Sequence, residues 1–468
     1  MEVKGQAFNY ITDGAQLAAG LHRLKASGSE LALDTETGIR PEWRNKVTES
    51  RGDPIQPRLC PHLGHICLLT LTPVNGKPEV FDFVWLRHNK VDLNPIYELL
   101  EQKTLIAHKA QFDGKMLLGE FKKNTLRWWC TLQADKVLSN ATGSKYGLIR
   151  GHSLYSCLRD YLGITLKGKG SIQTQDWDLD LEKRTLDNPY WLEMLNYAAA
   201  DTRYLHQLKA KLEGWICNPL PSDWMNRHDT PDEACGFGMA RTMQLENDMI
   251  NIYIEMEYYG FPTSIDLIKE FQEGIEIEMY DLACDLCDLL GIELPPPDLG
   301  LDYIKPYPKT LKVFNNPTKV VELLNEHKIV TDNAQKLTLT RVLSLMDEIY
   351  KQQTTEGSDQ GISYLNDEEE SRYKLIEDYE LSDLVQGSKI LNTLLQYKRA
   401  VKQHGMSMLR FVNPATGNIH PDVKGPVSTG RMAMGSPNLQ QVSNSSKVLI
   451  ELDIVDGTIQ HYSSSKLV

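Results

Sequence analysis

Long hydrophobic runs are missing from this sequence, and their absence excludes a membrane-spanning protein. No stretch approaches the roughly 18 consecutive apolar residues that a membrane helix needs. The first residues, MEVKGQ, have no apolar core behind a basic head, so we expect no secretory signal peptide. Both absences predict a cytoplasmic location, whether in a bacterium or in a virus-infected host cell.

A disulfide framework and an overall excess of basic residues are also missing. The eight cysteines lack the spacing of a secreted scaffold, so we expect reduced thiols. Cys284 and Cys287 have no second pair, which disfavours a zinc site. The net charge of −13 argues against a wholly basic nucleic-acid coat, although it permits local basic surfaces on an acidic enzyme.

The length of the chain and the change in sequence pattern along it indicate several domains. A chain of 468 residues is too long for one core, and roughly 150 residues per domain suggests about three units. In the first part, strand-like runs alternate with helical patterns, which predicts a mixed α/β sheet covered by helices. The strand-like runs are 31–37, 66–71, 80–86 and 105–108. A proline-rich break at 217–222 follows, and beyond it the pattern is mostly helical.

The strand expected at 31–37 carries the first chemical signal. Leu31 and Leu33 alternate with smaller or polar neighbours, so the opposite face presents Asp34 and Glu36 side by side. Two carboxylates on one face repel each other unless a cation lies between them. With oxygen ligands and no histidine or cysteine close by, the expected cation is Mg²⁺ or Mn²⁺.

Two further acids are expected near this strand. The run 105–108 leads directly into a helix, which places Asp113 at a strand-to-helix junction, where function concentrates in such sheets. In the helical pattern 191–212, Tyr197 and Asp201 are four residues apart and share one face. A phenol and a carboxylate on one helix face can serve a single site.

In this order and on these elements, the residues resemble the DEDDy 3′–5′ exonuclease family, which has an RNase H-like sheet. The catalytic set implied by the resemblance is Asp34, Glu36, Asp113, Tyr197 and Asp201, of which the four acids are the metal ligands. The family usually has Asn four residues before the third acid, where this chain has Lys109. That departure concerns the positioning of the primer end and leaves the ligands in place.

The same resemblance implies the chemistry of phosphodiester hydrolysis. Two ions of Mg²⁺ or Mn²⁺ would supply a hydroxide at neutral pH and stabilise the leaving 3′-oxyanion. Asp34 would bridge both ions, Glu36 and Asp201 would complete one, and Asp113 would act through the water shell of the second. Tyr197 would orient the attacking water, since a phenol pKa of about 10 suits an orienting group better than a base.

Several later segments resemble family A DNA polymerases of the phage type. The matching segments are 255–261, 314–319, 395–399, 413–420, 428–431 and 436–442. The divisions implied are an exonuclease domain at 1–216, a connector at 217–262, a helical thumb at 263–411, the start of a palm at 412–442 and a tail of different origin at 443–468. The partner implied is DNA, as single-stranded 3′ ends and as primer–template duplex.

Charge in the later part agrees with this resemblance. Between Gln386 and Arg431, seven basic residues and one acid give a local net charge of +6, which is typical of a duplex-binding surface. The DNA-binding residues that we expect are Lys398, Arg399, Lys402, Ser428, Thr429, Gly430, Arg431, Asn438 and Gln440. The polar run 352–371 is typical of a loop or insertion, either solvated or binding a partner.

We therefore expect the amino-terminal portion of a family A DNA polymerase for DNA replication, with a proofreading nuclease and a DNA-binding thumb. The palm aspartates of the family pattern do not follow Val442, so the chain alone should not extend a primer, and a second chain should carry the rest of the palm and the fingers. Two other functions stay open. One is a non-catalytic DNA-binding subunit with vestigial acids, and the other is an RNase D-like 3′–5′ exoribonuclease.

The tail after Val442 has a pattern of its own. Val448, Ile450 and Leu452 alternate, and Asp456-Gly457 is a hairpin-turn signal, which together predict two strands. This resembles the opening block of a split intein, and Ser443 would then be the splicing nucleophile. A truncated gene and an intron read as protein are the alternatives.

Overall fold

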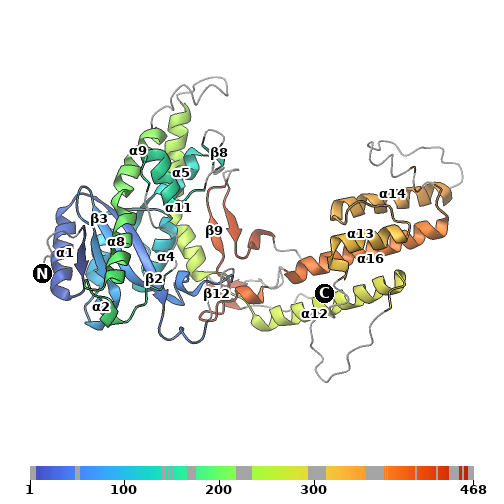
Figure 1. The fold of residues 1–468 in the computed structure, drawn as a ribbon, viewed down its shortest axis with the longest axis horizontal. Coiled ribbons are helices and arrows are strands. Elements are labelled where there is room, and N and C mark those ends of the chain that lie inside the picture. The colour runs from blue at the N-terminus through green and yellow to red at the C-terminus, as the bar shows by residue number, and fades with distance from the viewer. Residues whose placement is uncertain are drawn as a thin grey trace. The chain divides into compact units, whose positions relative to one another are not determined.

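The computed structural model describes most of the chain. The described residues are 7–47, 53–139, 144–145, 148–149, 151–165, 175–217, 234–293, 313–354, 374, 376, 378–405, 408–427, 431–441, 453–455 and 458–461. They form two compact units, one comprising Met1–Thr263 with Arg410–Val468 and the other Ser264–Leu409. Figure 1 presents the fold.

A six-stranded sheet is the centre of the described part of the first unit. The strands are β1 (Asn9–Ile11), β2 (Glu30–Ile39), β3 (Gly64–Pro73), β4 (Glu79–Asp82), β5 (Thr104–Ala107) and β6 (Arg127–Cys130). Their order is β1-β4-β3-β2-β5-β6, and β3 runs antiparallel to β2 and β4 while the other neighbours are parallel. The predicted mixed α/β sheet, of the RNase H-like kind, is confirmed.

Helices cover both faces of this sheet. They are α1 (Gly14–Ala26), α2 (Phe83–His88), α3 (Asn94–Glu101), α4 (Ala110–Phe121), α5 (Thr131–Leu138), α6 (Leu154–Cys157), α8 (Pro189–Arg203) and α9 (Leu205–Cys217). Leu31 and Leu33 of β2 pack into a core with α1, α3 and α4. Ala32 faces the other way, toward α5 and α9. The alternation of β2 therefore determines which of its side chains reach each layer.

Two predicted elements end differently in the structure. The strand expected at 80–86 stops at Asp82, because the Asp82 carboxylate accepts hydrogen bonds from the backbone N–H groups of Val84 and Trp85 and begins α2. The helix expected at 191–212 is two helices, α8 and α9, which meet at Tyr204. Elsewhere in this unit, the short helix α6 continues as a wider π-helical turn to Leu162.

A long helix, α11 (Ala234–Tyr259), packs against α4, α5 and β6 of the first unit. The Asn247 side chain accepts from the backbone N–H of Cys130, and the Asn251 side chain accepts from the Trp128 indole, each at 3.1 Å. A Cβ on Gly114 of α4 would lie 2.2 Å from Ile254, so the glycine permits this close helix contact. The residues expected as a connector are thus part of the first unit.

Residues of the expected palm start also belong to this unit. The strands β9 (Asp422–Lys424) and β10 (Ala433–Gly435) pair in antiparallel fashion. Glu257 at the end of α11 accepts from Val423 N at 2.8 Å and pairs with Lys115 of α4 at 3.0 Å. In the tail, β11 (Asp453–Val455) pairs with β12 (Thr458–His461), whereas the expected strand at 448–452 lies outside the described residues.

The second unit is helical, as predicted. Its helices are α12 (Ile265–Leu289), α13 (Pro317–Glu326), α14 (Lys336–Thr354) and α16 (Leu381–Gly405). One face of α12 is buried at Ile268, Ile275, Met279 and Leu286, and α12 and α14 both pack on α16. Across the described parts of the chain, no helix is long and apolar enough to cross a membrane. Most of the expected loop at 352–371 lies outside the described residues.

A buried ion pair joins the sheet to the segment that leads into α8. The Arg184 guanidinium donates to both oxygens of Asp82, at 2.9 and 2.8 Å, and neither side chain is exposed. The guanidinium also lies 4.1 Å from the centre of the Trp191 ring on α8. Tyr10 of β1 donates a further hydrogen bond to Asp82 at 2.5 Å. This network holds α8 against the edge of β4.

Replacing Arg184 with Met should destabilise the first unit strongly, because the Asp82 carboxylate stays buried without its counterion. The expected loss in the free energy of unfolding is about 3–5 kcal/mol. Urea denaturation followed by circular dichroism measures it. The matched control is Lys183→Met, whose side chain pairs with Asp180 at the surface and whose loss should leave the midpoint nearly unchanged. Equal effects of the two substitutions would contradict the assignment.

Candidate active site

The strand β2 carries two of the predicted acids at the middle of the sheet. Asp34 and Glu36 alternate with buried residues and lie on the face that α8 covers. Asp201 approaches them from α8. One carboxylate oxygen from each of the three lies within 4.8 Å of the others. The structure therefore brings these three predicted residues together although 165 positions separate Glu36 from Asp201 in the numbering.

Asp113 is held next to β2 from the first turn of α4. Its Oδ1 atom accepts from the Thr35 backbone N–H at 3.0 Å and from the Thr35 hydroxyl at 2.7 Å, and the residue is 2 % exposed. Thr35 lies between the two acids of β2. The charge of Asp113 acts on both Asp34 and Glu36, so the fourth predicted acid is part of the same electrostatic cluster.

Desolvation and mutual repulsion make these carboxyls unusual acids. Burial raises the pKa of Asp34 and of Glu36 well above its ordinary value, and the neighbouring acids raise it further. Burial also raises the pKa of Asp113 to about 7, against the hydrogen bonds from Thr35 and the charge of Lys109. A divalent cation would relieve this repulsion, and a set made only of carboxylate oxygens suits a hard cation. The residues therefore fit a divalent metal.

Tyr197 lies four residues before Asp201 on α8. The helix begins with Asn188 as its N-cap and Pro189 at the first position, and this start sets the face that Tyr197 and Asp201 share. Burial, together with the charges of Asp201 and Glu36, raises the pKa of Tyr197 far above its ordinary value. The phenol is therefore neutral in any ordinary buffer and can orient a group but not remove its proton.

Lys109 occupies the position that departs from the exonuclease pattern. It caps α4 with φ of +74°, in the left-handed region that a residue such as Asn adopts more readily than Lys. Its ammonium lies 5.8 Å from the Phe112 ring centre, and its charge lowers the pKa of Asp113. The backbone shape that suits Asn is thus retained, and the side chain adds a positive charge near the acids.

Tyr155 is a residue of the site that the sequence did not single out. It belongs to the short helix α6, and the charge of Asp201 acts on its hydroxyl. Burial and the charge of Asp201 raise the pKa of Tyr155 to about 12. Nothing in the local sequence marks it, because Asp201 lies more than 40 positions further along the chain.

A second cluster near β2 is an ion-pair network. Asp178 Oδ1 accepts from His65 Nε2 at 2.7 Å, pairs with Arg44 at 3.2 Å and lies 3.3 Å from Cys67 Sγ. Because a guanidinium and an imidazole already satisfy this oxygen, we do not interpret the cluster as a metal centre. A Cβ on Gly38 would lie 2.2 Å from Asp178 Oδ2, so the glycine two positions after Glu36 admits this side chain.

The residues expected to contact DNA fall on both units. Lys398, Arg399 and Lys402 lie on α16, and burial lowers the pKa of Lys398. In the first unit, Gln440 is used locally, since its Oε1 accepts from Met434 N at 3.2 Å and its N–H donates to Asn438 Oδ1 at 3.2 Å. Arg431 accepts from Val427 N through its backbone oxygen.

Four of the expected residues cannot be placed. Ser428, Thr429, Gly430 and Ser443 lie outside the described residues. The assignment of Ser443 as a splicing nucleophile therefore stays a prediction.

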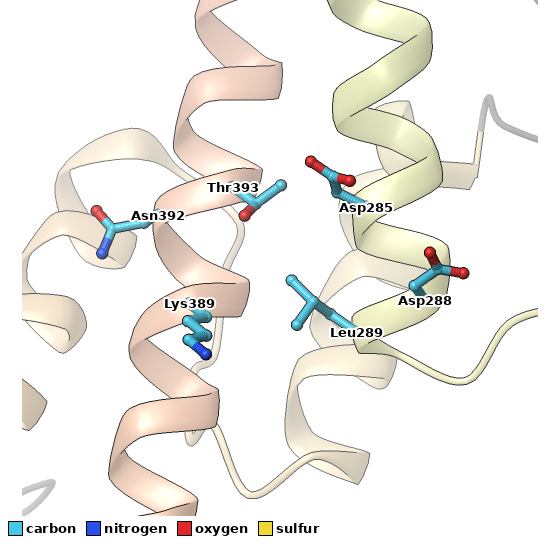
Figure 2. A pocket seen from close by; sticks show the side chains of 6 residues that line it. All are labelled: Asp285, Asp288, Leu289, Lys389, Asn392 and Thr393. Atoms are coloured by element: carbon cyan, nitrogen blue, oxygen red, sulfur yellow. The ribbon is translucent and has the colours of Figure 1, made fainter.

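A pocket of about 390 Å³ lies between α12 and α16 in the second unit (Figure 2). Its lining residues are Asp285, Asp288, Leu289, Lys389, Asn392 and Thr393. None of them is among the predicted site residues. The pocket therefore does not bear on the acidic cluster of the first unit.

A family model described as 3′–5′ exonuclease, DNA_pol_A_exo1, matches residues 66–216. This range contains Asp113, Tyr197 and Asp201. This part of the chain therefore matches a 3′–5′ exonuclease domain. No curated protein matches the chain in sequence.

One solved structure resembles this chain in fold, and a second is similar over a shorter part of it. The polymerase domain of Pol1 from M. smegmatis, in complex with DNA primer-template and dNTP, has a TM-score of 0.54 at 13 % identity and covers 94 % of this chain. The chain spans 57 % of the length of that structure. Brucella melitensis NrnC bound to pGG has a TM-score of 0.36 at 20 % identity and covers 54 % of this chain and 94 % of its own.

The pH dependence of metal binding is a direct consequence of the raised acid pKa values. In the folded, metal-free protein the pKa of Asp113 is about 7, above the roughly 4 of an unfolded aspartate. The stability due to this group is therefore present at low pH and lost as the pH rises through 7. Added Mn²⁺ should raise the unfolding temperature of the first unit more at pH 8 than at pH 5.5.

Differential scanning fluorimetry in EDTA and in excess Mn²⁺ measures this difference. The variant Asp34→Asn removes one ligand and one source of repulsion, so its metal-free form should lose less stability with rising pH and gain less from Mn²⁺. An equal gain at the two pH values in the parent would show that the acids do not bind the ion.

Proposed function

We propose that the first unit is a metal-dependent 3′–5′ exonuclease of the proofreading kind found in family A DNA polymerases. The observation that carries the proposal is the convergence of Asp34, Glu36 and Asp201, with Asp113 beside them, in and around the segment matched as an exonuclease. Acids that are distant in sequence gather around the same stretch of β2, where their mutual repulsion must be offset.

In this proposal, two ions of Mg²⁺ or Mn²⁺ supply a hydroxide and stabilise the leaving 3′-oxyanion when they are bound. Asp34, Glu36 and Asp201 would hold them through carboxylate oxygens that lie within 4.8 Å of one another. Asp113 contributes through its second oxygen, since Thr35 engages only Oδ1. The fold holds these groups in place before any substrate arrives, so little reorganisation is needed.

Tyr197 has a separate role in the proposal. Its phenol stays neutral because burial and nearby carboxylates oppose its ionisation. A neutral phenol beside the acids can form a hydrogen bond to a water molecule and so set the direction of its approach to the phosphorus atom. Tyr197 is therefore an orienting group, and the base must be supplied elsewhere in the site.

The substrate we propose is DNA. Two observations support this substrate: the polymerase-like fold and the local net charge of +6 between Gln386 and Arg431. In this proposal the chain binds primer–template duplex and removes nucleotides from single-stranded 3′ ends. Lys398, Arg399 and Lys402 on one helix of the second unit are the proposed phosphate contacts there.

Replacing Asp34 with Ala should lower the rate of metal-dependent nucleotide release from a 3′ end by on the order of 10³-fold, because a shared metal ligand is lost. Replacing Tyr197 with Phe should cost about 10-fold, since a single neutral hydrogen bond is removed. Release of labelled nucleotides from single-stranded DNA measures both. Glu98→Ala, an exposed acid on α3, is the control. An Asp34 variant as fast as the parent would refute the site.

The choice of substrate separates the proofreading enzyme from an RNase D-like enzyme. A proofreading nuclease should trim a DNA primer with a mismatched 3′ end faster than a fully paired one, because the frayed end reaches the site more readily. It should also prefer DNA to RNA of the same sequence. Gel analysis of matched DNA and RNA strands tests this, and faster digestion of RNA would favour the exoribonuclease.

A further inference from the structure

We propose that Trp177 is a positioning residue that acts through Tyr197 by fixing the direction of its phenol. This inference rests on the exonuclease function proposed above and extends it to a residue outside the acidic set. The centres of the Trp177 and Tyr197 rings lie 6.2 Å apart with 43° between their planes, within the range of direct aromatic pairs. Trp177 is only 3 % exposed, and the partly buried Tyr197 packs against the same core.

The helix α8 by itself leaves the direction of the Tyr197 phenol open. A helix fixes where a side chain leaves the backbone, but rotation about the two side-chain bonds of a tyrosine still moves its hydroxyl. A neighbouring ring limits that rotation, because other positions of the phenol either collide with it or lose the contact. The Trp177 indole is such a ring, so the contact selects one orientation of Tyr197.

The Trp177 indole is itself held from the side of α8. The Trp177 backbone oxygen accepts a hydrogen bond from Arg184 Nη1 at 2.6 Å. The Trp177 ring meets the Trp191 ring of α8 edge-on, with 6.4 Å between the centres and 72° between the planes. The Arg184 guanidinium lies over this second ring, and Trp191 is fully buried. The indole that contacts Tyr197 therefore has little freedom of its own.

The next residue, Asp178, ties the same segment to β2. Gly38 of β2 and His65 of β3 are paired across the sheet, and the Asp178 side chain lies against both. Its Oδ1 bonds to His65 Nε2 at 2.7 Å, and its Oδ2 occupies the space that a Cβ on Gly38 would fill. Gly38 follows Glu36 by two positions on the same strand. The segment therefore bridges the strand that carries the acids and the helix that carries the phenol.

This bridge determines which step of the reaction Trp177 affects. In the proposed mechanism the acids hold the metal ions, and the Tyr197 hydroxyl orients the attacking water. Orientation of a reacting group acts on the chemical step, where a displacement of about 1 Å can cost on the order of 10²-fold in rate. Loss of the indole leaves room beside the Tyr197 ring, so the phenol turns away while the acids keep their positions. The value of kcat should therefore fall without a change in substrate binding.

A double-mutant cycle tests the inference. Trp177→Leu should lower kcat for nucleotide release from single-stranded DNA by about 3- to 10-fold and change KM by less than about twofold. The upper limit is the loss caused by Tyr197→Phe, because Trp177 acts only through that hydroxyl. In the Tyr197→Phe background, Trp177→Leu should therefore have no further effect. A fall in kcat by the same factor in both backgrounds would overturn the inference, because a residue that only supports the fold behaves in that way.

A conservative variant and a metal measurement separate positioning from loss of the fold. Trp177→Phe keeps an aromatic ring beside Tyr197, so it should lower kcat by only about twofold and again have no effect in the Tyr197→Phe background. In both Trp177 variants, Mn²⁺ should raise the unfolding temperature as much as in the parent, because the acids stay in place. A smaller gain from Mn²⁺ would show that Trp177 supports the metal ligands themselves, and the inference would fail.

Trp129→Leu is the matched control for removal of a buried tryptophan. Trp129 lies on the edge strand β6, is 8 % exposed and packs in the core beside α5 and α9. Its replacement should lower the unfolding temperature and leave kcat within about twofold of the parent. A fall in kcat equal to that of Trp177→Leu would contradict a specific role of the contact with Tyr197.

Failure of this inference is distinguishable from failure of the proposed function. If the parent releases nucleotides, Asp34→Ala is impaired and Trp177→Leu equals the parent, the role of Trp177 falls alone. If the parent releases no nucleotides from DNA or RNA, the proposed function fails and this inference fails with it.

Discussion

Repulsion among four carboxylates is the constraint on which the rest of the first unit depends. Asp34, Glu36, Asp113 and Asp201 raise the cost of one another's ionisation, and burial adds to that cost. Left to local preferences, such groups would separate and become solvated. They stay together because each is mounted on an element that the core holds in place: the central strand β2, the first turn of α4 and the last turn of α8.

The supporting contacts around the acids follow from this constraint. Thr35 donates two hydrogen bonds to Asp113, from its backbone N–H and its hydroxyl, and neither involves Asp34 or Glu36. On the far side, the pair of Arg184 with Asp82 fixes the chain just before α8, and Trp191 stacks on the same guanidinium. The position of Asp201 thus depends on an ion pair whose members carry no chemistry themselves. Such a pair contributes more through the geometry it imposes than through its net stability.

How far the site was predictable differs from residue to residue. Asp34 and Glu36 were predictable because a two-residue period puts them on one strand face. Tyr197 and Asp201 were predictable because a spacing of four residues puts them on one helix face. The sequence did not predict the break between α8 and α9 at Tyr204 or the early end of β4, since capping and packing decide where an element ends. Tyr155 had no periodic signal at all.

The sequence by itself determined the alternation of β2, the faces of α8 and α12, and the order of the acids along the chain, because these depend on neighbours within a few residues. Only the tertiary structure decided which faces meet. The approach of Asp201 to Glu36, and the packing of α11 with the sheet layer and with β9, join residues far apart in the chain. Such contacts arise from the burial of shared surface, which no local pattern encodes.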